Sequence, residues 1–117
     1  MQTTNLMKTL VAATVAAGAL YCCSAKAADA QENWDHYCAA CHGKDGKGDT
    51  MMGRKLGMKD YTDSKVQASF TDADAAKAIK EGVKEDDRQK MKPFADKLTD
   101  DEIQALVKHV RGFKPAQ

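Results

Sequence analysis

Apolar residues recur along this chain at helical intervals, and no stretch shows the strict alternation of a half-buried strand. The clearest helical stretch follows Thr99, which forms a Thr-x-x-Glu capping box with Glu102. Its apolar positions, spaced i, i+3, i+4 and i+7, are Ile103, Leu106, Val107 and Val110. His109 lies off this apolar stripe, as His36 does on the first helix, so we expect both histidines to be exposed.

Three other stretches have the same period. The first places Trp34, Tyr37, Cys38 and Cys41 on one helical face. A second helix begins at a capping box formed by Thr71 and Asp74 and carries Ala75, Ala78 and Ile79 up to Gly82. Residues 63–70 predict a shorter helix with Val66 and Phe70 facing inward. The pattern therefore predicts an all-α fold.

The first helix carries the sequence Cys-x-x-Cys-His at Cys38, Cys41 and His42. This spacing is the attachment signature of c-type haem. Two intervening residues let one helical turn present both thiols to the two haem vinyl groups, and the following histidine then lies beneath the iron. Residues 45–48, rich in glycine, predict the turn that ends this helix. We therefore expect one covalently attached haem c per chain.

A Cys-x-x-Cys pair has two other common uses, a redox dithiol and half of a zinc site. The dithiol reading requires a βαβ context, and no strand pattern precedes Cys38. The zinc reading requires a second Cys/His pair at finger spacing, which His36 and His109 do not provide. Both alternatives are therefore weaker than haem attachment.

The first thirty residues have the order of a secretory signal peptide. A basic start at Lys8 precedes the uncharged, mostly apolar residues 10–23. Small-x-small cleavage sites end at Ala27 and at Ala30. We expect a signal peptide at residues 1–30, a single mature domain at residues 31–117 and a periplasmic location, with an uncleaved N-terminal anchor as the alternative.

So small a domain has few apolar residues for a core, and the covalently held macrocycle would complete it.

Taken together, three segments of the chain resemble the small monohaem class I cytochromes c of bacteria. They are the Cys-x-x-Cys-His motif, residues 91–94 (Met-Lys-Pro-Phe) and residues 97–103, which open the last helix. The resemblance covers the whole mature chain. It implies an all-α, class I cytochrome c fold of about four helices wrapped around the haem. It also implies that the first and last helices cross, with Trp34 or Tyr37 against Leu106, Val107 or Val110.

In that family a late methionine is the distal iron ligand, and Met91 matches its place. A segment far along the chain can also reach the haem face opposite His42. Three other methionines, Met51, Met52 and Met58, follow the motif closely and are expected to pack against the ring instead.

One family feature is missing from this sequence. Many members have a proline after the haem turn, next to a carbonyl that accepts the ring N–H of the ligand histidine. Residues 48–53 contain no proline. The backbone carbonyl of Thr50 or of Met51 could accept from His42, and the sequence leaves both open.

The net charge of the full chain is +1, and the predicted mature chain is neutral, which argues against a nucleic-acid partner. Its basic residues gather in two stretches, one after the haem motif and one around Met91. They are Lys44, Lys47, Arg54, Lys55, Lys59, Arg88, Lys90, Lys92 and Lys97. These residues favour a basic rim that steers the protein onto an acidic partner, although a solvated mixed surface is an equal alternative.

These features predict a non-enzymatic, monomeric one-electron carrier without stable membrane insertion after signal cleavage. The resemblance implies a quinol-oxidising cytochrome complex as donor and a haem–copper oxidase or a periplasmic reductase as acceptor. Two other classes remain as alternatives: a small haem peroxidase with an open sixth position, and a gas sensor in which the ligand displaces Met91.

Overall fold

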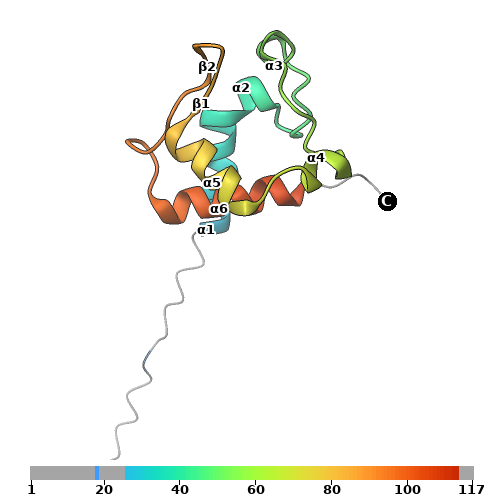
Figure 1. The fold of residues 1–117 in the computed structure, drawn as a ribbon. Coiled ribbons are helices and arrows are strands. Elements are labelled where there is room, and N and C mark those ends of the chain that lie inside the picture. The colour runs from blue at the N-terminus through green and yellow to red at the C-terminus, as the bar shows by residue number, and fades with distance from the viewer. Residues whose placement is uncertain (1–17, 19–25, 114–117) are drawn as a thin grey trace, which may run out of the picture.

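A computed structural model describes residue 18 and residues 26–113. Its helical elements are α1 (Lys26–Asn33), the π-helical segment η1 (Trp34–Cys38), α2 (Ala39–His42), α3 (Met51–Leu56), α4 (Ser64–Ala68), α5 (Asp72–Glu81) and α6 (Asp100–Gly112). Figure 1 shows α6 along the base of the view and α3 at the top. The helices agree with the predicted all-α fold, to which one short two-stranded hairpin is the exception. Apart from residue 18, the basic start and the apolar run of the predicted signal peptide lie outside the described residues.

Elements α1, η1 and α2 follow one another without a break, and α1 packs across α6 (Figure 1). Trp34, which is only 2% exposed, belongs to the same buried cluster as Leu106, Val107 and Val110. The predicted contact between the first and last helices is therefore confirmed. Element α5 also packs on α6 and contributes Ile79 to this core.

Both predicted capping boxes are present. The Thr99 hydroxyl accepts from the Glu102 N–H at 3.2 Å, and the Glu102 carboxylate accepts from the Thr99 N–H at 2.7 Å. In the same way, the Thr71 hydroxyl accepts from the Asp74 N–H at 3.0 Å, and the Asp74 carboxylate accepts from the Thr71 N–H at 2.9 Å. These bonds satisfy N–H groups that have no partner within the helix, so they fix the starts of α5 and α6.

The chain between α5 and α6 forms an antiparallel hairpin of β1 (Val83–Glu85) and β2 (Arg88–Met91), which the sequence pattern did not predict. Its tight turn places Asp86 and Asp87 at φ values of 49° and 60°. Two central residues with positive φ suit the right-handed twist of a short hairpin. The strands show no alternation because β1 is exposed throughout and β2 is only partly covered at its end.

Element α3 packs directly on the turn that follows α2. The Thr50 hydroxyl caps α3 by accepting from the Gly53 N–H at 2.8 Å, and it donates to the Ala40 carbonyl at 2.8 Å. At Gly53 a Cβ atom would overlap the carbonyl oxygens of Cys41 and Gly48. The backbones of α2 and α3 therefore approach so closely that only glycine fits at position 53.

The predicted glycine turn at residues 45–48 is confirmed, with positive φ at Gly46 and Gly48. The Gly48 N–H closes this turn by donating to the His42 carbonyl at 2.7 Å.

Within residues 26–113, none of the helices combines the length and the apolar character that a bilayer crossing requires.

Candidate haem site

A cavity of about 430 Å³ opens between the helices and the hairpin. Residues from η1, α2, the loop after α3, α5, β2 and α6 all contribute to its wall. Its wall is mostly apolar but also includes the charged residues Lys59, Asp74, Glu85 and Lys90. The other lining residues are Trp34, Cys38, His42, Gly57, Met58, Tyr61, Phe70, Ala75, Ala78, Ile79, Val83, Met91, Leu106 and Val110. The volume falls within the range of about 300–1,000 Å³ that is typical of cofactor sites.

The cavity brings together three of the four residues that the sequence singled out. Cys38 and His42 reach it from the first helical run, and Met91 reaches it from the end of β2. Cys41 is half-buried in α2, one residue before His42, and is a free thiol like Cys38. A histidine and a methionine from separate segments can supply the two axial ligands of a low-spin haem iron.

The other methionines divide into two groups. Met58 lines the cavity, as predicted for a packing residue. Met51 is 81% exposed, Met52 is 43% exposed, and neither lines the cavity. The prediction that these two pack against the ring is wrong. Because α3 turns Gly53 toward the α2 turn, its first two side chains remain at the surface.

His42 is 9% exposed, and its Nδ1 atom is buried without a hydrogen-bond partner. The Thr50 carbonyl accepts from the Arg54 N–H at 2.9 Å, in the first turn of α3. Because Nδ1 has no partner, neither the Thr50 nor the Met51 carbonyl, the two acceptors that the sequence left open, accepts from His42 in this structure. The ring instead contacts the aromatic rings of Trp34 and Tyr61.

Burial shifts both kinds of titratable group in this wall toward their neutral forms. Desolvation lowers the pKa of His42, so its imidazole is neutral near pH 7 and has a lone pair for a metal. Desolvation, assisted by Cys41, raises the pKa of the Cys38 thiol to about 12. A buried neutral thiol is a poor nucleophile, which disfavours the redox-dithiol alternative.

His109 departs from the sequence prediction. It is half-buried, its Nε2 atom has no hydrogen-bond partner, and its ring lies 5.2 Å from that of Trp34 and 4.9 Å from that of Phe113. Burial lowers its pKa, against an opposing effect of Asp35. The helical pattern of α6 predicted an exposed His109 because a pattern within one helix does not reveal rings from elsewhere. In the structure, Trp34 from η1 and Phe113 at the end of α6 cover the His109 ring. His36 is exposed, as predicted.

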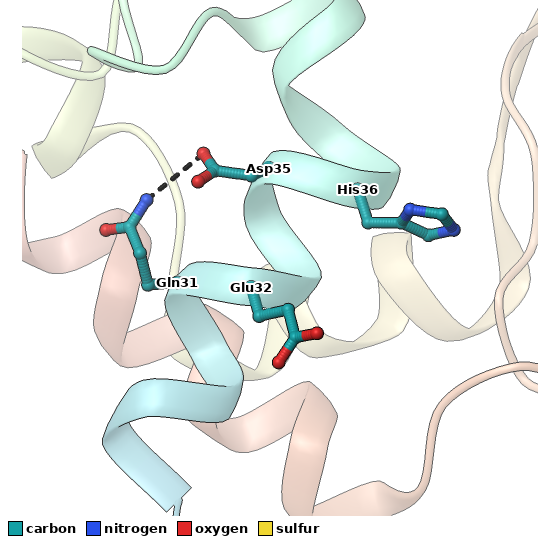
Figure 2. Close-up of a pocket in the computed structure, with 4 residues that line it drawn as sticks. All are labelled: Gln31, Glu32, Asp35 and His36. Carbon is teal, nitrogen blue, oxygen red and sulfur yellow. Dashed lines mark hydrogen bonds between the residues drawn. The ribbon is translucent and has the colours of Figure 1, made fainter.

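A second depression, of about 500 Å³, lies on the outer surface of α1 and η1 (Figure 2). Its lining residues, Gln31, Glu32, Asp35 and His36, are all exposed. Gln31 donates to Asp35 at 3.1 Å, and Glu32 and His36 point away from that pair. Among the described residues, no three His, Cys, Asp or Glu side chains are grouped so that they could hold a metal ion. The interior cavity is therefore the candidate site.

The fold and this site together define a small class I c-type cytochrome. The chain belongs to the family described as cytochrome c oxidase, cbb3-type, subunit III, which matches residues 25–110. Among solved structures it is similar to the KustC0563 c-type cytochrome, at 38% identity and a TM-score of 0.66, over 74% of this chain and 98% of that one. A point mutant of that cytochrome matches at 38% identity and a TM-score of 0.64, over 74% of this chain and 99% of the mutant. No curated protein matches the chain.

The family confirms the resemblance drawn from the sequence and supports an electron-carrier role with a haem c cofactor. The residues of the cavity fit that cofactor. Its wall combines an apolar lining with an imidazole that has a buried, unpartnered nitrogen, a thioether and a thiol. Cys38 and Cys41 would hold the porphyrin, and His42 and Met91 would face its iron.

Proposed function

We propose that this protein is a periplasmic one-electron carrier with a single haem c, attached through Cys38 and Cys41 and ligated by His42 and Met91. The observation that carries the proposal is the meeting of Cys38, His42 and Met91 in one mostly apolar cavity. Haem, when bound, supplies one-electron chemistry at its iron. Ligation by histidine and methionine leaves no open iron position for a substrate, which favours a carrier over a peroxidase.

The chain's own residues prepare this site in three ways. The mostly apolar wall would lower the local dielectric constant around a bound haem, which would raise the cost of ferric charge and favour the reduced state. Burial keeps the His42 imidazole neutral. The hairpin delivers Met91 from a segment remote in sequence from the Cys-x-x-Cys-His motif.

We further propose that the protein docks through the segment around α3. Lys44, Lys47, Lys55 and Lys59 are exposed, as are Met51 and Met52 in the same segment. Exposed methionines within a basic surface suit an acidic partner that has an apolar centre. The donor and acceptor proposed from the resemblance are a quinol-oxidising cytochrome complex and a haem–copper oxidase or periplasmic reductase.

The hairpin contributes less to this basic rim than its sequence predicts. Glu85 forms an ion pair with Lys90 across the two strands. Arg54 likewise pairs with Asp49. The register of the hairpin also sets Glu85 opposite Arg88, so acidic and basic side chains lie next to each other on it. Steering therefore depends mainly on the lysines around α3.

The ligand assignment is tested by Met91→Ala, with Met58→Ala as the matched control because both methionines line the cavity. We expect Met91→Ala to lose the methionine-to-iron charge-transfer band of the ferric protein and to bind carbon monoxide readily in the ferrous state. Its midpoint potential should fall, since a thioether favours ferrous iron more than water does. Met58→Ala should keep the band and cost only packing stability, about 2–5 kcal/mol at most.

Absorption spectra of both oxidation states provide the measurement. A Met91→Ala protein that keeps the wild-type band would show that another residue is the distal ligand. A wild-type protein that is high-spin, or that binds carbon monoxide at once, would instead favour the peroxidase or the gas sensor.

A further inference from the structure

The ring of His42 contacts two aromatic side chains that the proposed electron transfer does not itself require. The Trp34 ring lies 5.6 Å from it at an interplanar angle of 39°, and the Tyr61 ring is stacked at 5.4 Å and 27°. These centroid separations lie within the 4.5–7 Å range in which aromatic rings attract one another. Trp34 and Tyr61 thus form an aromatic pair beside His42.

Both members of the aromatic pair are tied to the loop that immediately follows His42. The Trp34 indole N–H donates to the Gly43 carbonyl at 2.9 Å. The Tyr61 backbone N–H donates to the Gly46 carbonyl at 2.8 Å. These two bonds fix Trp34 and Tyr61 relative to the haem motif. Trp34 comes from η1, and Tyr61 comes from the loop before α4.

Further contacts keep the aromatic pair from moving independently of α6. The Gln67 amide donates both to the Tyr61 carbonyl at 2.7 Å and to the Val110 carbonyl at 2.9 Å. The Trp34 ring packs against Phe113 at 5.0 Å. The pair is thus anchored to the C-terminal end of α6.

His42 has no hydrogen-bond acceptor at Nδ1 that could orient its ring. Ligand histidines in metal sites usually donate that N–H to a carbonyl or carboxylate, which fixes the ring plane and strengthens the ligand. We propose that Trp34 and Tyr61 are positioning residues that set the plane of the His42 ring by aromatic contact in place of a hydrogen bond. The proposal rests on the assignment of His42 as the proximal ligand.

The stacked partner allows a graded test, because Tyr61→Phe keeps an aromatic ring and Tyr61→Leu does not. Tyr37→Leu is the matched control, since Tyr37 packs on Phe94 and does not line the cavity. The readout is the proton NMR spectrum of the ferric holoprotein. The hyperfine shifts of its haem methyl groups depend on the orientation of the axial ligand planes.

We expect Tyr61→Leu to change the spacing of the haem methyl shifts or to give a second set of resonances. Tyr61→Phe and Tyr37→Leu should both retain the wild-type pattern. A wild-type pattern in Tyr61→Leu would overturn the proposal. So would an altered pattern in Tyr61→Phe, which would make the phenolic hydroxyl the determinant instead of the ring.

The same spectra separate this proposal from the function on which it rests. If His42 is the ligand, its ring protons in the wild-type protein are strongly hyperfine-shifted. Unshifted His42 protons would contradict the ligation itself. Shifted His42 protons with an unchanged Tyr61→Leu pattern would contradict only the role of the aromatic pair.

Discussion

At the scale of single residues, the sequence predicted what depends on local spacing. Cys38 and His42 lie on one cavity wall because four residues make about one helical turn. The exposure of Met51 and the burial of His109 were predicted wrongly, because each depends on a neighbour from another element. For His109 that neighbour is Trp34, which a helical stripe alone does not reveal.

The burial of His109 has a consequence for stability at mildly acidic pH. Its pKa in the folded protein lies below the ordinary value of 6.5, so the unfolded chain binds the proton more readily. The stabilising contribution is complete above about pH 6.5 and is lost as the pH falls below that value. We expect the free energy of unfolding of the holoprotein to decrease between about pH 7.5 and 5.5.

His109→Gln should flatten this pH dependence, and His36→Gln, at an exposed site, should leave it as in the wild type. Denaturant unfolding at a series of pH values provides the measurement. Equal slopes in wild type and His109→Gln would show that other groups cause the decrease. His42 should not contribute in the holoprotein, where the iron would occupy the imidazole.

At the scale of elements, the helices with capping boxes were predicted because their signals lie within a few residues. Thr99 and Glu102 bond to each other's backbone, so the start of α6 can be read directly from the chain. The sequence contains no comparable local signal for the hairpin. Its strands are short and exposed, and its turn uses Asp86 and Asp87 at positive φ in place of the usual Asn-Gly.

The contact between α2 and α3 is sensitive to a single methyl group. We expect Gly53→Ala to destabilise the holoprotein by about 1–3 kcal/mol, because the added Cβ overlaps two backbone carbonyl oxygens that cannot rotate away. Gly112→Ala is the matched control, since no atom lies within 4 Å of its added Cβ and alanine favours a helix. Thermal unfolding followed by circular dichroism distinguishes them, and equal stability of the two variants would contradict the close approach.

At the scale of the whole molecule, the predicted domain boundary falls within a helix. Cleavage after Ala30 would divide α1 and remove Ala30, which is 6% exposed in the core. Cleavage after Ala27, the other predicted site, would leave that residue in place. The boundary itself stays a prediction, and the packing of α1 on α6 favours the earlier site.

Mass spectrometry of the mature protein under denaturing conditions tests the cleavage site and the haem attachment together. We expect the mass of a chain that begins at Ala28 plus one haem. A chain beginning at Gln31 would place the cut at the second site. A chain mass without haem would contradict covalent attachment through Cys38 and Cys41.

Electrostatic steering depends on how charge is distributed over the surface of the whole molecule. If the lysines around α3 guide docking, electron transfer to the physiological acceptor should slow as ionic strength rises, because salt screens exposed charges. Lys47→Glu should slow the low-salt rate severalfold more than Lys108→Glu on α6, although both lysines are exposed. Stopped-flow kinetics measures both rates. Equal slowing, or a rate independent of salt, would favour an apolar docking contact.

The hairpin that carries Met91 makes the two sides of the site unequal in their dynamics. A two-stranded ribbon is marginally stable alone, so we expect this mostly exposed hairpin to open without unfolding the rest of the molecule. His42, by contrast, is held in helix α2 beside buried rings. Amide hydrogens of β1 and β2 should therefore exchange with solvent well before those of α6. We therefore expect the wall of the cavity that holds Met91 to open on a shorter timescale than the wall that holds His42, which should open only when the protein unfolds.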